Sequence, residues 1–319
     1  MENRFCRIKT LRYKPFPSLF FLPFFMKIPL ILPQFKRYAL YERAMMPKTI
    51  KEIMSIVQLF SDEYSQSVHL ITTNHIRNFL YQRKYEKMWT NKTFRNKRQY
   101  LKTFFDYCIR ENYIHTNPVT KIEKPKLEKR LPRCLNKKQT ANLLMQLDTY
   151  SWYYQSEFLR NQTIIRFFLF TGVRLSELLK LQSKAVNFDE SEMLIVQGKG
   201  RKDRIIPIHP ELLPYLKAYS KAQKQRKRNS EFFFTSIRSD KGLTEKNLYA
   251  IVKKLRNACG FHFTPHMLRH TFGKLSIEAN LNPFKLKEIM GHSNISTTQI
   301  YISVSTESIK KSFFKLHLI

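Results

Sequence analysis

Acidic residues are scarce in this 319-residue chain: 24 Asp and Glu stand against 57 Lys and Arg, which leaves a formal net charge of +33. A surplus of this size repels itself in a compact protein unless something neutralises it. The shortage of negative charge argues against a basic protein with no fixed ligand. It favours a polyanionic partner, and nucleic acid is the leading candidate.

Paired cysteines and nucleotide-binding loops are also missing. The four cysteines, Cys6, Cys108, Cys134 and Cys259, are scattered and form no C-x-x-C pair, so neither a disulfide framework nor a zinc site is indicated. A reducing, cytoplasmic setting fits this pattern. No G-x-x-x-x-G-K-[ST] loop occurs, which argues against ATP-driven chemistry.

The chain has no uninterrupted apolar run long enough to span a bilayer. Its most apolar stretch, KPFPSLFFLPFFMKIPLILP at residues 14–33, is interrupted by prolines and by Lys27, and prolines at this density break a helix. We therefore leave residues 1–33 as an unassigned N-terminal arm. They are either a mobile arm or extra sequence upstream of a natural start at Met26. A signal peptide is the third alternative, but no small-residue cleavage site follows.

Helical periodicity begins at about residue 34. Isoleucines and other apolar residues recur at helical spacing behind Pro47, and the segment NKTFRNKRQYLKTFFDYCIRENYI places its apolar residues on one side and basic residues on the rest. Residues 34–116 are therefore predicted to form a compact helical bundle with a basic flank. Residues 117–132 combine prolines with many charges, which predicts a linker. Its basic residues are either solvated or cross a phosphate backbone.

Residues 133–319 are predicted to be mostly helical with a small antiparallel sheet. MLIVQGKGRKDRIIPI contains two β-like runs around a Gly-Lys-Gly turn, which is typical of a hairpin with Lys199 at its tip. EFFFTS is predicted to form a further short strand. The whole chain is thus expected to belong to the mainly α (α+β) class.

Three stretches carry candidate chemistry. In FTGVRLSELLKL, Arg174 precedes Glu177 by three residues, so both share a helical face and the carboxylate can orient the guanidinium. In TPHMLRHTF, a threonine cap and a first-turn proline leave His266 and Arg269 on one face of the opening turns, where the positive end of the helix dipole suits a phosphate. Each stretch alone is also compatible with ordinary surface structure.

The third stretch is GHSNISTTQIY, residues 291–301. Asn282 and Pro283 are predicted to begin a helix that Gly291 ends, so that His292 falls in the turn. Ser296 and Gln299 have the S-x-x-Q spacing of a capping box, which would start a new helix carrying Tyr301. This arrangement would hold an imidazole and a phenol near one phosphate.

In order along the chain, R-x-x-E, a hairpin Lys, H-x-L-R-H, G-H and a Tyr nine residues after that His are far more specific together than singly. The chain resembles the tyrosine recombinases, also called phage integrases, and looks closest to their Xer-like branch. The resemblance covers about residues 34–319, with TGVRLSELLKL, GKGRKDRIIPI, HMLRHTF and MGHSNISTTQIY in their expected places. It implies a SAM-like core-binding domain at residues 34–116, a linker at 117–132 and a catalytic domain at 133–319.

The resemblance implies site-specific recombination of DNA. Tyr301 would attack the scissile phosphate and form a 3′-phosphotyrosyl link with release of a 5′-hydroxyl. Arg174 and Arg269 would clamp the non-bridging oxygens, and His292 would donate a further hydrogen bond. Lys199 would protonate the leaving 5′-oxygen as general acid.

Two further residues would support this chemistry. His266 would assist proton handling near the tyrosine, and Glu177 would orient an arginine without touching the phosphate. No metal, nucleotide or other cofactor is required, because the bond energy stays in the phosphotyrosine.

The implied partner is double-stranded DNA, held between both lobes by phosphate contacts. In the family four protomers act on two DNA sites, so a homotetramer, or an assembly with a related recombinase, is expected. No membrane partner is expected. The C-terminal segment TESIKKSFFKLHLI looks like a helix that docks on a neighbour, or alternatively packs on its own domain. The apolar face of that segment comprises Ile309, Phe313, Phe314 and Leu316, and the residues expected to contact DNA are Arg95, Lys97, Arg98, Lys102, Lys202 and Arg204.

Two alternatives remain open at this stage. A type IB topoisomerase would use similar chemistry but relax supercoils alone, and a DNA-binding accessory protein would have the fold without activity. The full set of candidate catalytic residues argues against the second.

Overall fold

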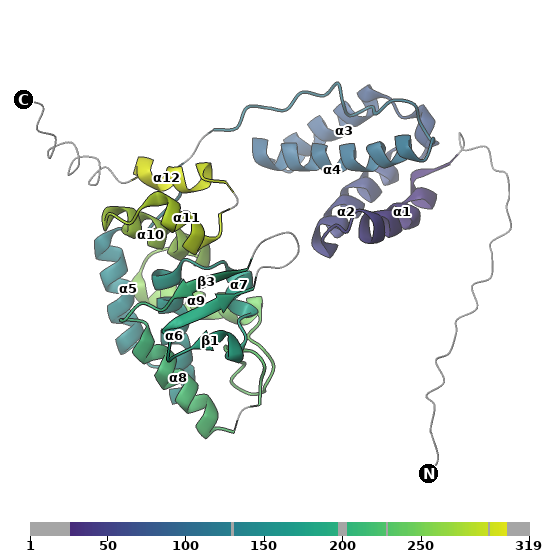
Figure 1. The fold of residues 1–319 in the computed structure, drawn as a ribbon. Helices are drawn as coiled ribbons and strands as arrows, with labels where there is room; N and C mark the ends of the chain where they lie inside the picture. Colours follow the sequence, from purple (N-terminus) through teal and green to yellow (C-terminus); the bar gives the residue numbers. More distant parts are fainter. Residues whose placement is uncertain (1–25, 129–130, 197–202, 228, 293, 305–319) are drawn as a thin grey trace, which may run out of the picture. The chain divides into compact units, whose positions relative to one another are not determined.

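The computed structural model describes residues 26–128, 131–196, 203–227, 229–292 and 294–304 (Figure 1). The chain forms two compact units, Met1–Lys129 and Arg130–Ile319, each with a hydrophobic core of its own. Both are mainly helical, and the second contains a three-stranded antiparallel sheet, so the predicted fold class is confirmed. Within the described ranges, no helix has both the length and the apolar character needed to cross a membrane.

The first unit is a helical bundle. Helix α2 packs against α1 and α4, and α3 also packs on α4. Its core is rich in phenylalanine, because five buried rings from four helices, Phe35, Phe60, Phe79, Phe104 and Phe105, lie close to one another. The helices are α1 (Ile28–Arg37), the π-helical turn η2 (Tyr38–Glu42), α2 (Pro47–Glu63), the short 3-10 turn η3 (Val68–Leu70), α3 (Thr73–Glu86) and α4 (Asn91–Arg110).

Helix α1 corrects the expected end of the N-terminal arm. The arm was expected to run to residue 33, yet α1 begins at Ile28 and contains Pro33. A proline in the first turn, as at Pro29, loses no hydrogen bond, and burial of Ile31 and Phe35 offsets the bond that Pro33 removes. Residues 1–25 lie outside the described part of the chain.

The expected linker also begins later than predicted. Val119 and Ile122 are buried in the core of the first unit. The Arg98 guanidinium of α4 donates hydrogen bonds to the carbonyl oxygens of Ile122, at 2.6 Å, and of Val119 and Thr120, at 3.0 and 3.2 Å. The turn at these residues therefore belongs to the bundle, held by a buried cation that the sequence pattern placed on the surface.

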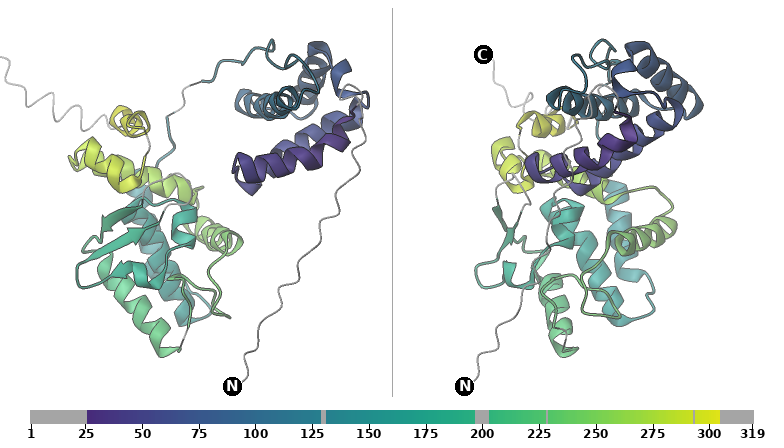
Figure 2. Two further views of the ribbon diagram at one scale, coloured as in Figure 1. Left: turned by 45° about the vertical axis from the view of Figure 1, so that its right-hand side comes forward. Right: turned by 90° about the vertical axis from the view of Figure 1, so that its right-hand side faces the viewer.

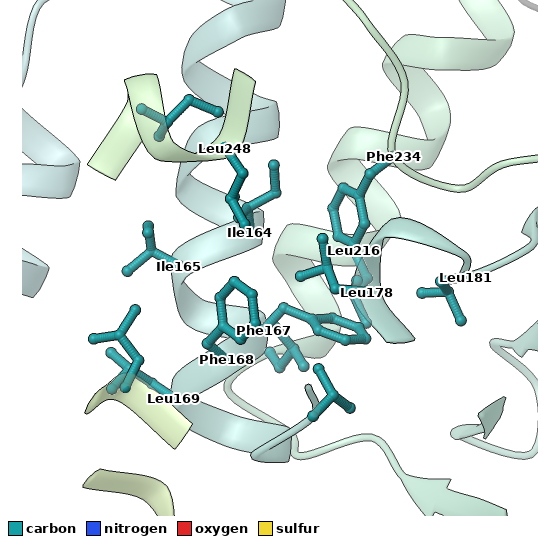
Figure 3. Close-up of a cluster of buried hydrophobic side chains, with 14 of the residues drawn as sticks. Ile164, Ile165, Phe167, Phe168, Leu169, Leu178, Leu181, Leu216, Phe234 and Leu248 are labelled. Atoms are coloured by element: carbon teal, nitrogen blue, oxygen red, sulfur yellow. The ribbon is translucent and has the colours of Figure 1, made fainter. Parts of the chain in front are cut away.

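The second unit is built around α6, which is buried on nearly all sides. Apolar side chains of α6, including Ile164, Phe167 and Phe168, meet Leu216 of α8 and Phe234 in a single cluster (Figure 3). Helix α10 packs along α6 as well. The helices are α5 (Lys137–Thr149), α6 (Gln155–Thr171), α7 (Leu175–Leu179), the 3-10 turn η4 (Ser183–Ala185), α8 (Leu213–Gln225), α9 (Glu245–Cys259), α10 (Pro265–Glu278), α11 (Pro283–Met290) and α12 (Ser296–Val304).

The sheet contains β1 (Val186–Asn187), β2 (Glu192–Ile195) and β3 (Arg204–Pro207), in that order. Strands β2 and β3 pair in antiparallel register from Glu192 opposite Pro207 to Ile195 opposite Arg204. This confirms the predicted hairpin strands. The hairpin tip, with Lys199 and Lys202, lies outside the described residues.

The strand predicted at EFFFTS does not form. Phe232 and Thr235 make only isolated bridges, to Gln182 and Gly242. Phe233 and Phe234 are consecutive, yet both are buried. Successive side chains of a strand point to opposite faces, so this pair packs into one core only because the segment is irregular.

Helices α10, α11 and α12 pack against one another and carry most of the candidate site (Figure 2). The starts of α10 and α11 are capped as the sequence predicts, whereas α12 begins at Ser296 itself, the residue predicted to precede it as the cap. The Thr264 hydroxyl accepts a hydrogen bond from the Met267 backbone N–H at the start of α10, and the Asn282 side chain accepts one from Phe284 at the start of α11. Gly291 ends α11 in the left-handed conformation, with φ of 64°.

Candidate active site

The Arg174 guanidinium is fixed at the start of α7 by Glu177. The Glu177 carboxylate accepts hydrogen bonds from the Arg174 backbone N–H at 2.8 Å and from its Nη1 at 2.7 Å. It also accepts hydrogen bonds from both terminal nitrogens of Arg204, at 3.2 and 2.8 Å. Burial alone would raise the pKa of Glu177, but the hydrogen bonds from Arg204 and Arg174 and the charge of Arg204 outweigh it and lower that pKa.

The arginines also bind the carboxyl ends of two helices, where backbone carbonyls lack helical partners. Arg269, in α10, donates to the carbonyl oxygens of Gly172, after α6, at 2.5 Å and of Met290, the last residue of α11, at 2.8 Å. Arg174 donates to Gly291 at 2.6 Å, and Arg204 Nε to a carbonyl of the last turn of α11 at 2.7 Å. Two helix ends thus hold three guanidinium groups together.

Gly172 is required where α6 ends. Its φ of +60° is a conformation that residues with a Cβ adopt only with strain, and an added Cβ would lie 2.3 Å from the Phe272 ring. Only glycine lets the chain turn here while its carbonyl reaches Arg269.

The described part of the site has an excess of positive charge. Glu177 forms ion pairs with Arg174 and Arg204, and its carboxylate is also the negative charge that acts on the nearby Arg269. Arg269 is only 3% exposed, and burial together with the nearby Arg174 charge lowers its pKa to about 10, so it stays protonated at neutral pH. A bound anion would offset this repulsion.

His292 lies directly after the helix end that the arginines bind. Its Nδ1 is 2.9 Å from the Thr298 hydroxyl of α12, and its ring stacks on Tyr301 with 6.1 Å between centroids. Burial and the charges of Arg269 and Arg174 lower the pKa of His292 to about 3, so the ring is neutral at pH 7.

Tyr301, in α12, is 1% exposed and packs against α10. Its phenol oxygen lies 2.9 Å from Nδ1 of His270. Burial raises the pKa of Tyr301 to about 12, while the positive charges of Arg269 and Arg174 oppose part of that rise. The phenol is therefore protonated at neutral pH.

The structure brings together most of the residues singled out from the sequence. Arg174, Glu177, Arg269, His292 and Tyr301 converge through the contacts and charges above. His266 is exposed, with its ring edge-on to His270 at 4.5 Å. The general acid predicted at Lys199 lies outside the described residues.

Three contributors were missed: His270, Thr298 and the pairing role of Arg204. His270 could have been found, because H-x-L-R-H repeats a histidine at i and i+4, which places both on one helical face. Nothing in the local sequence indicates which threonine of STTQ meets His292. The ion pair between Arg204 and Glu177 joins segments far apart in the chain.

The residues expected to contact DNA occupy different environments. Arg98 is 4% exposed and donates its hydrogen bonds to backbone carbonyls of the turn at residues 119–122, so the structure gives it a structural role inside the first unit in place of the predicted DNA contact. Arg204 is likewise corrected, because its side chain is 9% exposed and paired with Glu177. Lys97 pairs with Glu52 and Lys102 with Asp106, and these ion pairs are partly exposed. Arg95 is half-buried and Lys202 is not described.

Among the described residues, no three His, Cys, Asp or Glu side chains come close enough to hold a metal ion. The chemistry available here is that of guanidinium, imidazole and phenol groups. Together they suit an anion that a phenol attacks.

Comparison with known proteins identifies the family. Residues 133–308 match the model of the phage integrase family. A tyrosine recombinase XerA from Pyrococcus horikoshii is 34% identical over 201 residues, 62% of this chain and 66% of the relative. A tyrosine recombinase XerC from Bacillus pumilus is 32% identical over 241 residues, 73% of this chain and 77% of the relative.

The fold agrees with that assignment. A crystal structure of XerH site-specific recombinase bound to a palindromic difH substrate, a post-cleavage complex, matches with a TM-score of 0.72 at 23% identity and covers 88% of this chain and 82% of that one. A structure of a lambda integrase dimer bound to a COC′ core site matches with a TM-score of 0.68 at 19% identity, over 85% and 97% of the two chains. The chain belongs to the phage integrase family and is a Xer-like tyrosine recombinase, an enzyme that breaks and rejoins DNA strands.

Proposed function

We propose that Tyr301 is the nucleophile of this recombinase and that Arg174 and Arg269 hold the scissile phosphate. The phenol oxygen attacks phosphorus, the bond to the 5′-oxygen breaks, and a 3′-phosphotyrosyl link stores the bond energy. A 5′-hydroxyl of a partner strand later reverses the step. The two guanidinium groups stabilise the negative charge that accumulates on the non-bridging oxygens.

One observation carries this proposal: side chains from four separate segments meet around the ends of α6 and α11. Arg174 and Arg269 bind adjacent residues, Gly291 and Met290, and His292 follows them directly. Tyr301 stacks on His292 and is influenced by both arginine charges. Such preorganisation matters because donors already in place need no reorganisation during the reaction.

Thr298 would set the tautomer of His292. The neutral imidazole can donate to a phosphate oxygen through Nε2 only if Nδ1 is unprotonated. The Thr298 hydroxyl, 2.9 Å away, must then donate to Nδ1. Thr298 therefore acts through His292.

The remaining assignments extend this proposal. Lys199 would protonate the leaving 5′-oxygen, and Glu177 would orient Arg174. His266, exposed beside His270, would assist proton handling. The net charge of +33 supports binding of duplex DNA by both units, with the first unit as the core-binding domain. The candidate phosphate contacts are Arg95, Lys97, Lys102 and Lys202.

The assembly and setting are proposed from the same chemistry. Exchange between two DNA sites needs four strand cleavages, which a tetramer of this chain, or a mixed tetramer with a related recombinase, would supply. The segment TESIKKSFFKLHLI, residues 306–319, lies outside the described residues and is proposed to dock on a neighbouring protomer, and the reaction would take place on DNA in the cytoplasm.

Covalent trapping tests the nucleophile. Full-length protein is incubated with a pool of nicked duplexes of random sequence, denatured in detergent, and the DNA that stays attached is recovered and sequenced. We expect mass spectrometry to find nucleotides linked through a 3′-phosphate to the peptide containing Tyr301. Tyr301→Phe should give no adduct while binding the recovered duplex as tightly as the unchanged protein.

A different linked tyrosine, or cleavage that leaves free 3′-ends, would contradict the assignment. A folded protein that binds the recovered duplex but forms no adduct would be an accessory protein. Tyr153, an exposed tyrosine of the same unit, supplies the matched control: Tyr153→Phe should form the adduct at the normal rate.

A further inference from the structure

The phenol of Tyr301 has one hydrogen-bond partner among the described residues, and it is not one of the residues predicted from the sequence. The oxygen lies 2.9 Å from Nδ1 of His270, and the ring centroids are 5.7 Å apart. The other neighbouring imidazole, His292, stacks on the phenol ring but directs its Nδ1 to Thr298.

The direction of this hydrogen bond follows from the phenol. Tyr301 is 1% exposed, so its O–H proton cannot be donated to bulk water, and a buried donor without an acceptor is costly. The described contacts offer it Nδ1 of His270. The phenol therefore donates and the imidazole accepts, which requires a neutral ring with the proton on Nε2.

The surroundings keep that ring neutral. Burial, followed by the charges of His266 and Arg269 on the same helix, lowers the pKa of His270 to about 4. The other titratable groups close by are His292, beyond α11, and Tyr301 itself, on α12. A phosphodiester anion bound to Arg269 would favour the imidazolium, because an opposite charge stabilises it.

Helix α10 is shaped to hold the phenol in this position. Gly273 follows His270 by three residues and so lies on the same face. An added Cβ at Gly273 would lie 2.7 Å from Cζ of Tyr301 and under 3.0 Å from both Cε atoms. Glycine costs a helix interior about 1 kcal/mol relative to alanine, so its presence here has a packing reason: it makes room for the ring.

We propose that His270 is a catalytic residue of strand cleavage, the acceptor of the Tyr301 proton. As the phenol oxygen bonds to phosphorus and the bond to the 5′-oxygen breaks, the O–H proton moves to Nδ1 of His270, giving an imidazolium. The leaving 5′-oxygen takes its proton from the separate general acid. On rejoining, the imidazolium returns its proton to the departing phenolate. This proposal rests on the role of Tyr301 proposed above.

The test compares His270→Asn and His270→Ala on the duplex recovered by covalent trapping. The asparagine oxygen takes roughly the place of Nδ1 and can accept a hydrogen bond but not a proton. Because general bases typically contribute about 10²–10⁴-fold, we expect both variants to cleave at least about 100-fold more slowly at pH 7, with unchanged DNA binding. Imidazole added to the solution should restore part of the activity of His270→Ala.

The pH profile separates proton transfer from mere positioning. Unchanged protein should lose activity at low pH as His270 becomes protonated, and His270→Asn should lack this limb and gain rate as hydroxide increases. His262→Asn, an exposed histidine of the same unit, is the matched control and should leave rate and profile unchanged. Should His270→Asn unfold, His270→Gln replaces it.

An asparagine variant that cleaves within about threefold of the unchanged protein, with the same profile, would overturn the proposal. If unchanged protein forms no adduct at Tyr301, the proposed nucleophile itself fails. If the adduct forms and the asparagine variant is normal, only the role of His270 fails.

Discussion

Arg98 in the first unit and Arg269 in the second are both buried and bind backbone carbonyls, but only Arg269 lies in the candidate active site. Arg98 in the first unit is 4% exposed and Arg269 in the second is 3% exposed. Arg98 holds the turn at residues 119–122 to the bundle, and Arg269 joins the ends of α6 and α11. Burial is the largest influence that lowers the pKa of each guanidinium.

The difference lies in what surrounds each guanidinium. Burial alone accounts for the lowered pKa of Arg98. The pKa of Arg269 is also lowered by the charges of Arg174 and Arg204 and raised by the phenol of Tyr301. Burial and carbonyl hydrogen bonds therefore do not mark an arginine as catalytic. What distinguishes Arg269 is that other guanidinium groups are held close to it against their mutual repulsion. A bound anion would offset that repulsion and stabilise the site.

Replacing Arg269 should give the largest effect of this comparison. Arg269→Ala removes a preorganised donor to the phosphate, which typically costs about 3–4 kcal/mol of transition-state stabilisation, or several hundredfold in rate. Covalent-complex formation on the trapped duplex measures this. Binding should change little, because many other phosphate contacts remain. Near-normal cleavage by Arg269→Ala would make it structural, like Arg98.

Replacing Arg98 should affect stability instead. Arg98→Ala leaves carbonyls of the 119–122 turn without a partner, and we expect the free energy of unfolding to fall by about 2–4 kcal/mol in urea titrations. The variant that remains folded should cleave at the normal rate. The salt dependence of DNA binding sharpens the contrast. Loss of a phosphate contact would lower the slope of log binding constant against log salt concentration by about 1, and we expect no change of that slope for Arg98→Ala.

Acid should destabilise the site through its two neutral histidines. The pKa values of His270 and His292 are lowered to about 4 and about 3, below the unfolded value near 6.5. The unfolded chain therefore binds more protons between these values, and the free energy of unfolding falls as pH drops below about 6.5. The slope is at most about 1.4 kcal/mol per pH unit for each histidine.

Urea titrations at pH 7 and pH 5 measure this slope. His292→Asn should reduce it, whereas His262→Asn, at an exposed position, should leave it as in the unchanged protein. Equal slopes for all three proteins would mean that neither histidine is held neutral by burial and the arginine charges.

Local sequence determined those features that depend on neighbouring residues. Caps at Thr264 and Asn282, the stop at Gly291 and the hairpin strands follow from short-range rules, and all formed as predicted. The order of motifs carried the family assignment. The prediction for Arg98 failed because its acceptors lie more than 20 residues further along the chain, where no periodicity reveals them.

The sequence by itself therefore determined most of the helices, the fold class and most of the candidate site residues that the structure brings together. Only the tertiary structure decided which of them touch: that His270 meets the phenol, and that Arg204 serves Glu177 rather than DNA. The physical reason is that these contacts join separate helices, so they depend on how the ends of α6 and α11 pack against α10, and packing is a property of the whole unit.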